Sequence, residues 1–476
     1  MTVTVAVLVG YLATLAALAI WSRKEPHPLK GFYLAGKNLP YWVVAFSANA
    51  TGESGWLLLG LTGMGYAVGA QAYWVIVGEM IGIAASWGFI SRKLKRLSDE
   101  TDSITLPDVL AAKFDDRWHL IRGVAVAIIA VMVTTYVSAQ MVATGKAFSG
   151  FIGLDYRAGV IIGAVIIIGY TFVGGYKAVS YTDVVQGVLM LAGLIAVPLV
   201  AISAAGGWGQ MTATLNEYDP GFIDMFSVLD GSTAGFVAAV SFAAIGLPFL
   251  GVPQMLIRYM SARDDTELKK ARIVSITVLF IFLFGAVTAG IAGRALFPGL
   301  EDSEQVFPTL ASELFPPLLT GVLFVIVLSA IMSTVDSLLL LASSSIVRDT
   351  MQKILGNPSS DATLAGYGKV VTVIIGVIAV FVAVYMAENK LIFWFVLFSW
   401  SGLGAAFGPV VLALLYDRRT TGAGIVAGML GGFLTSLVWV QFFKAGAYGL
   451  YEAIPGFTVA AVATVVVSRM TGKQSR

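Results

Sequence analysis

Residues 47–55 (SANATGESG) carry an amide, three hydroxyls, a carboxylate and two glycines through an otherwise apolar run from Tyr41 to Val68. Unpaired backbone groups are costly in hydrocarbon, so irregular backbone at membrane depth survives only beside protein or a polar cavity. Gly52 and Gly55 permit conformations outside the helix. Carbonyls freed by such a break can bind a cation, while the N-terminus of the next half-helix faces an anionic group. The stretch therefore predicts a polar cavity with a cation site.

Close packing of transmembrane helices is the alternative, because glycine and serine also let helices approach each other. Packing accounts for neither Asn49 nor Glu53. A charged side chain at mid-bilayer costs at least about 2.5 kcal/mol, so such residues are functional candidates by default. Glu79, in the next apolar run, is either a second site residue or a partner for a buried polar group.

A second polar cluster places five polar side chains within the nine residues 329–337. Ser333 and Thr334 are adjacent, and the carbonyl of Ala330 lies one turn behind them. Two hydroxyl oxygens and a carbonyl can thus converge on one point, which is the kind of ligand set that hard cations prefer. The alternative is that each hydroxyl only bonds the carbonyl four residues back.

Another interruption lies at 245–253 (IGLPFLGVP), where two prolines and two glycines remove helix donors and relax the backbone. Alone it could be a simple proline kink. Together with the break at 47–55 it gives interruptions at corresponding positions of two five-helix halves, which is typical of an inverted-repeat transporter.

Three further polar residues each permit a functional or a structural role. Tyr136 and Gln140 are four apart on one helix face, where they suit either a small polar ligand or an interhelical hydrogen bond. Asp183 lies near the inner end of an apolar run, where it can also be an N-terminal helix cap.

These residues require a bundle of membrane-spanning helices. The chain has 476 residues, of which 58% are hydrophobic and 12% charged, and its mean hydropathy is +0.85. We predict an all-α polytopic membrane protein, because runs of about 20 apolar residues span a bilayer. The candidate spans lie near residues 3–21, 41–68, 72–91, 121–150, 157–175, 183–205, 233–257, 273–293, 315–346, 368–387, 391–415, 422–443 and 448–468.

The charged loops test this count of thirteen, because positive residues accumulate on the cytoplasmic side. With the N-terminus outside and the C-terminus in the cytoplasm, all but five of the 30 Lys and Arg residues lie inside. Residues 258–272 are among the stretches assigned to inner loops. The five exceptions are Lys146, Arg157, Arg294, Lys390 and Lys444.

Composition also excludes several classes of function. The chain has no cysteine, so disulfides and thiol chemistry are excluded. His27 and His119 fall in charged linkers and do not support a metal site. A formal charge of +2 without a basic stripe argues against nucleic acid, and no GxxxxGK[ST], GxSxG or HExxH motif supports an ATP-driven pump or an enzyme. No obligate protein partner is evident.

The chain resembles the solute:sodium symporter family, and within it the bacterial sodium/proline symporters, over essentially its whole length. The matching stretches are SGWLLLGLTG (54–63), ITLPD (104–108), YTFVGGYKAVSYTD (170–183), MST followed by DSLLL (332–340), and FSWSGLGAAFGPVVLALL (398–415). The resemblance implies the five-plus-five inverted repeat called LeuT-type. The expected parts are an extra helix at 3–21, repeats at 41–205 and 233–415, and two last helices at 422–468.

The family also implies roles for single residues. One sodium ion would be held by the carbonyls of Ala50, Glu53 and Ala330 and the hydroxyls of Ser333 and Thr334. Asp183 matches an aspartate associated with sodium release. The residues implied for the solute, joined by Glu53 and Gln140 on their chemistry, are Ser54, Gly55, Trp56, Tyr136 and Phe249.

The chain departs from the pattern of proline carriers in the same region. Those carriers usually read ASDMSGW where this chain reads ATGESGW, so Gly52 occupies the aspartate position and Glu53 replaces methionine. A tryptophan and a tyrosine of the proline pocket appear as Ile245 and Phe249.

The prediction is sodium-coupled uptake of a small zwitterionic solute, proline or a related amino acid, across a bacterial plasma membrane by alternating access. Sodium is the expected coupling ion. The alternatives are a proton- or sodium-coupled carrier of another amine-bearing or organic solute that uses Glu53, an ion channel, and, more remotely, a membrane solute sensor.

Overall fold

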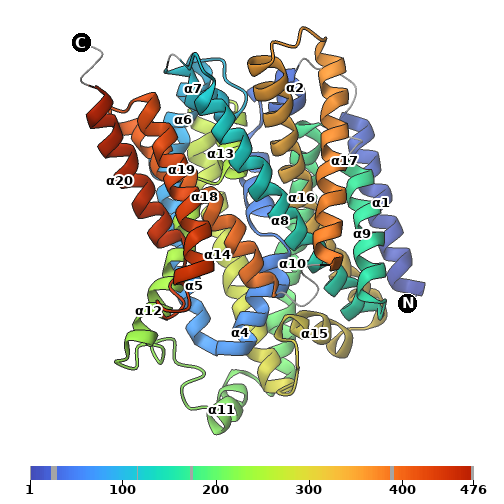
Figure 1. Ribbon diagram of the computed structural model, residues 1–476. Coiled ribbons are helices and arrows are strands. Elements are labelled where there is room, and N and C mark those ends of the chain that lie inside the picture. Colours follow the sequence, from blue (N-terminus) through green and yellow to red (C-terminus); the bar gives the residue numbers. More distant parts are fainter. Residues whose placement is uncertain (1, 23–28, 115, 172–174, 386–390, 473–476) are drawn as a thin grey trace.

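The computed structural model describes residues 2–22, 29–114, 116–171, 175–385 and 391–472. Every regular element within these ranges is helical, apart from one isolated bridge between Leu39 and Ala262. The prediction of an all-α protein is confirmed. Figure 1 shows most helices running roughly parallel along one axis, with the first and last helices, α1 and α20, on opposite sides of the bundle.

Ten helical stretches in the described ranges are long and apolar enough to cross a membrane, which confirms a multi-pass protein. They are Trp56–Glu100, Leu120–Ile152, Tyr176–Ala204, Thr233–Leu250, Asp265–Leu296, Pro317–Ile354, Asp361–Tyr385, Ile392–Tyr416, Gly422–Phe443 and Ala453–Thr471. Two shorter apolar stretches cover Val3–Leu18 and Tyr156–Gly169. The count of thirteen spans stays a prediction.

The first half of the chain contains the broken helix predicted around 47–55. Its elements are α1 (Thr2–Ser22), α2 (Leu29–Leu34), η1 (Ala35–Lys37), α3 (Tyr41–Gly52), η2 (Trp56–Leu61), α4 (Thr62–Val68), η3 (Gly69–Ala72), α5 (Tyr73–Ala85), η4 (Ser86–Ile90), α6 (Ser91–Glu100), α7 (Leu106–Ala112), α8 (Leu120–Ile152), α9 (Tyr156–Thr171) and α10 (Tyr176–Ala204). The span expected at 183–205 therefore begins at Tyr176, after Gly175 in extended conformation. Asp183 lies two turns inside α10, so the alternative that it caps the helix is wrong.

The second half of the chain also contains an interrupted helix, formed by α12, η5 and α13. Its elements are α11 (Trp208–Tyr218), α12 (Thr233–Ala243), η5 (Ala244–Leu250), α13 (Pro253–Ser261), α14 (Asp265–Leu296), η6 (Ser303–Gln305), α15 (Val306–Leu314), α16 (Pro317–Ser344), η7 (Ser345–Ile354), α17 (Asp361–Tyr385), α18 (Ile392–Tyr416), α19 (Gly422–Val438), η8 (Trp439–Phe443) and α20 (Ala453–Thr471).

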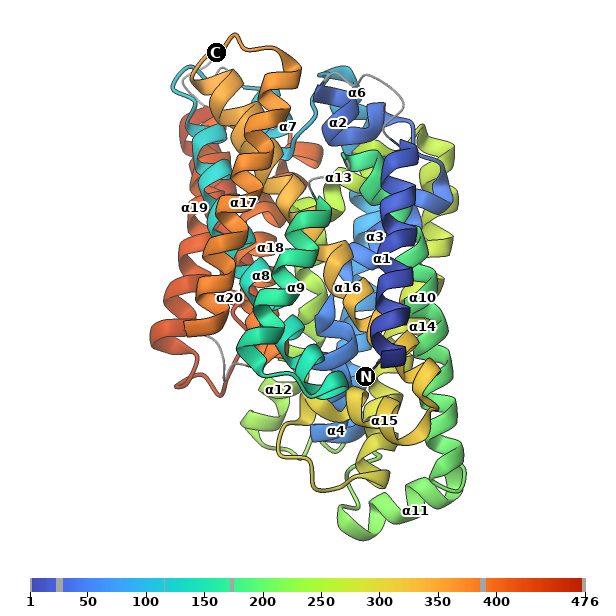
Figure 2. The same ribbon diagram turned by 90° about the vertical axis from the view of Figure 1, so that its right-hand side faces the viewer.

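Helices α3 and α16 lie in the centre of the bundle. Nearly all of α16 from Leu323 to Ser344 is buried, as expected for a helix that is apolar on every side. Helix α3 contacts α10, α13, α14 and α16. The last two helices pack on each other and on α18, away from this centre (Figure 2). The polar residues of α3 and α16 are thus held by protein on all sides.

Backbones meet directly where α5 crosses η5. A Cβ atom on Gly246 would lie 1.8 Å from the carbonyl oxygen of Gly78, so only glycine fits there. This contact fixes the interrupted η5 segment beside α5, and with it the position of Glu79, the residue that follows Gly78.

Candidate functional site

The first break separates α3 from η2. Helix α3 ends at Gly52, and Glu53 leaves the helix with φ −101° and ψ 82°, while its N–H donates to the Asn49 carbonyl at 2.8 Å. The chain resumes a helical course at Gly55, and η2 begins at Trp56. The break therefore frees carbonyls at the end of α3 and amides at the start of η2, as irregular backbone at a polar site should.

The second break lies opposite the first. The tight η5 helix ends at Leu250, Val252 is extended, and α13 starts at Pro253. A Cβ atom on Gly52 would lie 3.8 Å from Phe249 and 3.5 Å from Met255, one on each side of this break. The ends of α3, η2, η5 and α13 thus lie close together.

Five oxygen-bearing residues of α3 and α16, which we call the oxygen cluster, meet just before the first break. Ser333 Oγ donates to the carbonyls of Ala50 at 2.7 Å and Ala330 at 3.0 Å. Thr334 Oγ1 lies 3.1 Å from the Thr51 carbonyl oxygen and 3.5 Å from that of Ala50. All five residues are fully buried.

The oxygen cluster is suited to a sodium ion. It offers three carbonyls and two hydroxyls from two helices, and neutral oxygens are ligands that a hard cation accepts. Each hydroxyl can turn its proton away and present a lone pair instead. The structure brings together four of the five oxygens assigned from sequence and adds the carbonyl of Thr51, which sequence reasoning missed. The fifth assigned residue, Glu53, lies at the break itself, and its described contacts are those of its N–H and its carboxyl group.

A hydrogen-bonded group next to the break joins η2 to α8. Ser54 Oγ accepts from Gln140 Nε2 at 3.1 Å, from the Trp56 N–H at 3.1 Å and from the Tyr136 hydroxyl at 3.4 Å. The Gly55 N–H donates to Gln140 Oε1 at 3.1 Å. Tyr136 and Gln140 therefore lie on one face of α8, and their hydrogen bonds hold the residues at the start of η2 in place.

Aromatic rings cover this group. Trp400 of α18 meets Phe249 edge to face at 5.1 Å between ring centroids and Tyr136 at 6.3 Å. Trp56 instead stacks on Phe393 at 5.6 Å. Sequence reasoning missed Trp400, although it lies within the motif stretch 398–415. Three rings from η5, α8 and α18 therefore lie beside the Ser54 group.

Two carboxyl groups complete the site. Glu53 and Glu79 lie within hydrogen-bonding reach of each other, although one lies at the first break and the other in α5. They are 1% and 2% exposed, and Oε2 of each lacks a hydrogen-bond partner among the described residues. Buried polar atoms normally have a partner, so this pair has capacity to bind a donor beyond those that the described residues supply.

An ion pair lies on one side of the oxygen cluster. Arg258 Nη2 is 3.3 Å from Asp183 Oδ2 and donates to Thr51 Oγ1 at 2.8 Å and to Ser337 Oγ. Ser47 Oγ donates to the same Asp183 oxygen at 2.6 Å. Asp183 therefore lies within one hydrogen-bond network of Thr51, which fits its proposed role beside sodium.

Arg258 corrects the assignment of residues 258–272 to an inner loop. The side chain is only 1% exposed and belongs to α13. A cation in the apolar run that follows the second break is itself a signal of function, but the charge count treated it as a loop residue.

Another buried ion pair joins α8 to η6. Lys146 Nζ lies 2.6 Å from Glu304 Oε2 and 2.9 Å from Asp302 Oδ2. The Glu304 carboxylate also accepts the N–H groups of Ile392 at 3.0 Å and Phe393 at 2.9 Å. Burial raises the pKa of Glu304, and Lys146 opposes that shift. This pair ties α8, η6 and α18 together.

The fold and this geometry match known transporters. The family model for the sodium:solute symporter family matches residues 32–432. The chain is a member of the sodium:solute symporter family. It is a sodium-coupled membrane transporter rather than an enzyme, and the resemblance drawn from its motifs is confirmed.

Individual relatives cover nearly the whole chain. The high-affinity proline transporter PutP of Bacillus subtilis is 35% identical over 475 residues, 98% of this chain and 96% of that protein. A sodium/proline symporter of Staphylococcus aureus is also 35% identical, over 97% of this chain and 92% of that protein.

Solved structures agree on the fold. A substrate-bound, outward-open sodium-coupled sialic acid symporter aligns with a TM-score of 0.84 at 18% identity, over 98% of both chains. The nucleobase-cation-symport-1 transporter Mhp1 aligns with a TM-score of 0.55 at 12% identity, over 92% of this chain and 95% of that one. This symporter therefore shares the LeuT-type architecture.

Proposed function

We propose that this symporter couples sodium entry to uptake of proline or a closely related small zwitterion. The observation that carries the proposal is the oxygen cluster directly before the break, with the Ser54 group and the aromatic rings directly after it. An ion and a solute bound there share the same broken helix. The relatives named as proline transporters support proline as the first solute to test.

We infer the following roles. Sodium is held by the carbonyls of Ala50, Glu53 and Ala330 and the hydroxyls of Ser333 and Thr334. Binding there joins α3 to α16 and orders the break, which forms the solute pocket. Once both ligands are bound the site closes, and sodium leaves past Asp183.

The solute is bound by groups of opposite character. Its carboxylate faces the start of η2 and replaces Gln140 Oε1 and Ser54 Oγ as the acceptors of the Gly55 and Trp56 N–H groups. Its apolar ring packs among Phe249, Tyr136 and Trp400. Glu53, with Gln140 beside it, supplies the remaining polar contacts.

A second candidate solute class is favoured by the unpaired Oε2 atoms of Glu53 and Glu79. A buried carboxyl pair of this kind fits an ammonium group, because an amine supplies the missing hydrogen-bond donors and opposite charge. Another amine-bearing solute would use the same pair. The same pair also permits coupling to protons in place of sodium.

The proposed topology has thirteen spans in a bacterial plasma membrane, with the N-terminus outside and the C-terminus in the cytoplasm. Residues 41–205 and 233–415 form the two inverted repeats, 3–21 is an additional first helix, and 422–468 holds the last two. Interrupted helices at the start of both repeats, α3–η2 and α12–η5–α13, support this division.

Radiolabelled proline uptake into proteoliposomes tests the proposal. Inward gradients of sodium, of protons and of neither are compared, and unlabelled amino acids, betaines and amines compete in parallel. We expect accumulation with sodium alone and competition by proline. Accumulation with protons alone would replace sodium as the coupling ion, and stronger competition by a different amine would replace proline as the solute.

A further inference from the structure

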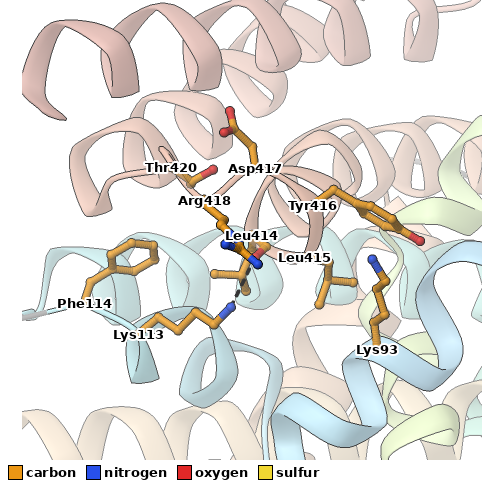
Figure 3. Close-up of a pocket in the computed structure, with 9 residues that line it drawn as sticks. All are labelled: Lys93, Lys113, Phe114, Leu414, Leu415, Tyr416, Asp417, Arg418 and Thr420. Atoms are coloured by element: carbon orange, nitrogen blue, oxygen red, sulfur yellow. Dashed lines mark hydrogen bonds between the residues drawn. The ribbon is translucent and has the colours of Figure 1, made fainter.

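A pocket of about 540 Å³ lies at the end of the bundle where α18 ends, away from the transport site (Figure 3). Its lining comes from three parts of the chain: the start of α6, the end of α7 and the connection between α18 and α19. The lining residues are Lys93, Lys113, Phe114, Leu414, Leu415, Tyr416, Asp417, Arg418 and Thr420.

Three cations converge on this pocket. Figure 3 shows Lys113 and Arg418 reaching toward Leu414 from opposite sides, with Lys93 near the ring of Tyr416. Lys93 Nζ lies 3.4 Å from that ring centroid, and Lys113 Nζ donates to the Leu414 carbonyl at 3.4 Å. Within the described part of the chain, none of the three is paired with a carboxylate.

The one acidic residue of the lining does not neutralise these cations. The Asp417 carboxylate is paired with Arg469 Nη2 at 2.8 Å and accepts the Arg419 N–H at 3.0 Å. In Figure 3 it points away from Lys113 and Arg418. The pocket therefore keeps an excess of positive charge and suits an anion.

The surroundings distinguish a lipid from a soluble anion. The pocket lies where two apolar spans, Ile392–Tyr416 and Gly422–Phe443, are joined, which is the level of the membrane surface. Tyr416 is 49% exposed and donates its hydroxyl to the Phe89 carbonyl, and the Phe89 side chain is 60% exposed. Cations beside exposed apolar side chains match a headgroup that continues into acyl chains.

We propose that this pocket binds the phosphate headgroup of an anionic phospholipid in the leaflet next to it. The phosphodiester lies between Lys113 and Arg418, with Lys93 at the rim. The glycerol backbone rests on the apolar floor formed by Phe114, Leu414 and Leu415, and the acyl chains leave along the exposed face that carries Phe89. The inference rests on membership of the symporter family and not on proline as the solute.

Native mass spectrometry of the purified full chain tests this site with dioleoyl phosphatidylglycerol, dioleoyl phosphatidylcholine and inorganic phosphate. We expect phosphatidylglycerol to bind at least about tenfold more tightly than phosphatidylcholine, since each of the three basic residues contributes up to about fivefold. The Lys93→Gln/Lys113→Gln/Arg418→Gln variant should lose at least about tenfold in phosphatidylglycerol affinity. The single variants Lys113→Gln and Arg418→Gln, if the triple variant does not fold, should each lose about fivefold.

The control variant removes three exposed cations outside the pocket, by Lys269→Gln/Arg272→Gln/Lys353→Gln. It should keep phosphatidylglycerol affinity within about twofold. Equal losses in both triple variants would overturn the proposal, because general surface charge would then explain binding. Displacement of the lipid by inorganic phosphate would overturn it in favour of a free-anion site. Failure of proline uptake in the same preparations would contradict the proposed solute while the lipid result stands.

Discussion

The two halves of the transport site hold their polar atoms in opposite ways. In the oxygen cluster the Ser333 and Thr334 hydroxyls already donate to carbonyls, and the oxygens that could bind sodium are neutral. In the carboxyl pair of Glu53 and Glu79 each group has an oxygen without a partner in the part of the chain that the structure describes, and the groups can carry charge. A neutral, self-satisfied cluster can exist with or without a cation at modest cost, whereas an unpaired buried carboxyl oxygen is costly until a donor arrives. We therefore propose that affinity for the solute depends on the pair, and affinity for sodium on the cluster.

Removing charge from the pair should have the largest effect. Glu53→Gln removes the strongest partner available to an ammonium group, and we expect the KM for proline to rise by roughly 10- to 100-fold. The sodium concentration for half-maximal uptake should change far less. Uptake kinetics in proteoliposomes at saturating sodium measure both values.

Two further variants make that result decisive. Glu79→Gln should raise the proline KM in the same direction, because the two groups act together. Glu301→Gln, on an exposed loop residue, should leave it unchanged. A sodium defect in Glu53→Gln with a normal proline KM would reverse the division between the two halves.

Removing a hydroxyl from the oxygen cluster should have an intermediate effect on the other ligand. Ser333→Ala or Thr334→Ala deletes one neutral ligand, and we expect the half-maximal sodium concentration to rise by about tenfold. The proline KM at saturating sodium should stay within about threefold. Sodium-dependence curves of uptake provide the measurement.

Ser329→Ala is the matched control for these variants. It removes a buried hydroxyl from the same helix, one turn earlier. This Ser329 hydroxyl lacks a hydrogen-bond partner among the described residues. An equal sodium defect in this control would mean that any buried hydroxyl of α16 matters and that the cluster has no special role.

A satisfied carboxylate far from the site should give the smallest effect. Asp264 caps α14 by accepting the N–H groups of Thr266 and Glu267, and these amides hold its pKa below the usual range. The cap therefore adds stability above the ordinary carboxyl pKa, and this stability is lost as pH falls through the lowered pKa of the folded state. Asp264→Ala should lower the free energy of unfolding by about 1 kcal/mol near neutral pH, with proline uptake unchanged.

Thermal unfolding in detergent, between about pH 6 and about pH 3, checks this. Asp264→Asn keeps the cap and should lose only this pH dependence. A change in proline KM in either Asp264 variant would show that a carboxylate outside the site also affects the solute.

The sequence by itself determined the class of this protein. Its apolar runs indicate membrane helices because backbone groups must be satisfied inside hydrocarbon, and its two interruptions indicate where irregular backbone lines a site. It also brought Ala330, Ser333 and Thr334 together, because these residues are neighbours on one helix and need no long-range information. Tyr136 and Gln140 share a face for the same reason.

Only the tertiary structure decided which distant groups meet. Glu53, at the first break, and Glu79, in α5, are 26 positions apart, and their meeting depends on how α3 and α5 are held around the second break. The charge count placed Arg258 in an inner loop and left Lys146 as an exception, yet each is buried against a carboxylate from another helical element. A local sequence pattern predicts which residues share a face of one helix. An ion pair between helices depends instead on packing, which residues far away in the chain determine.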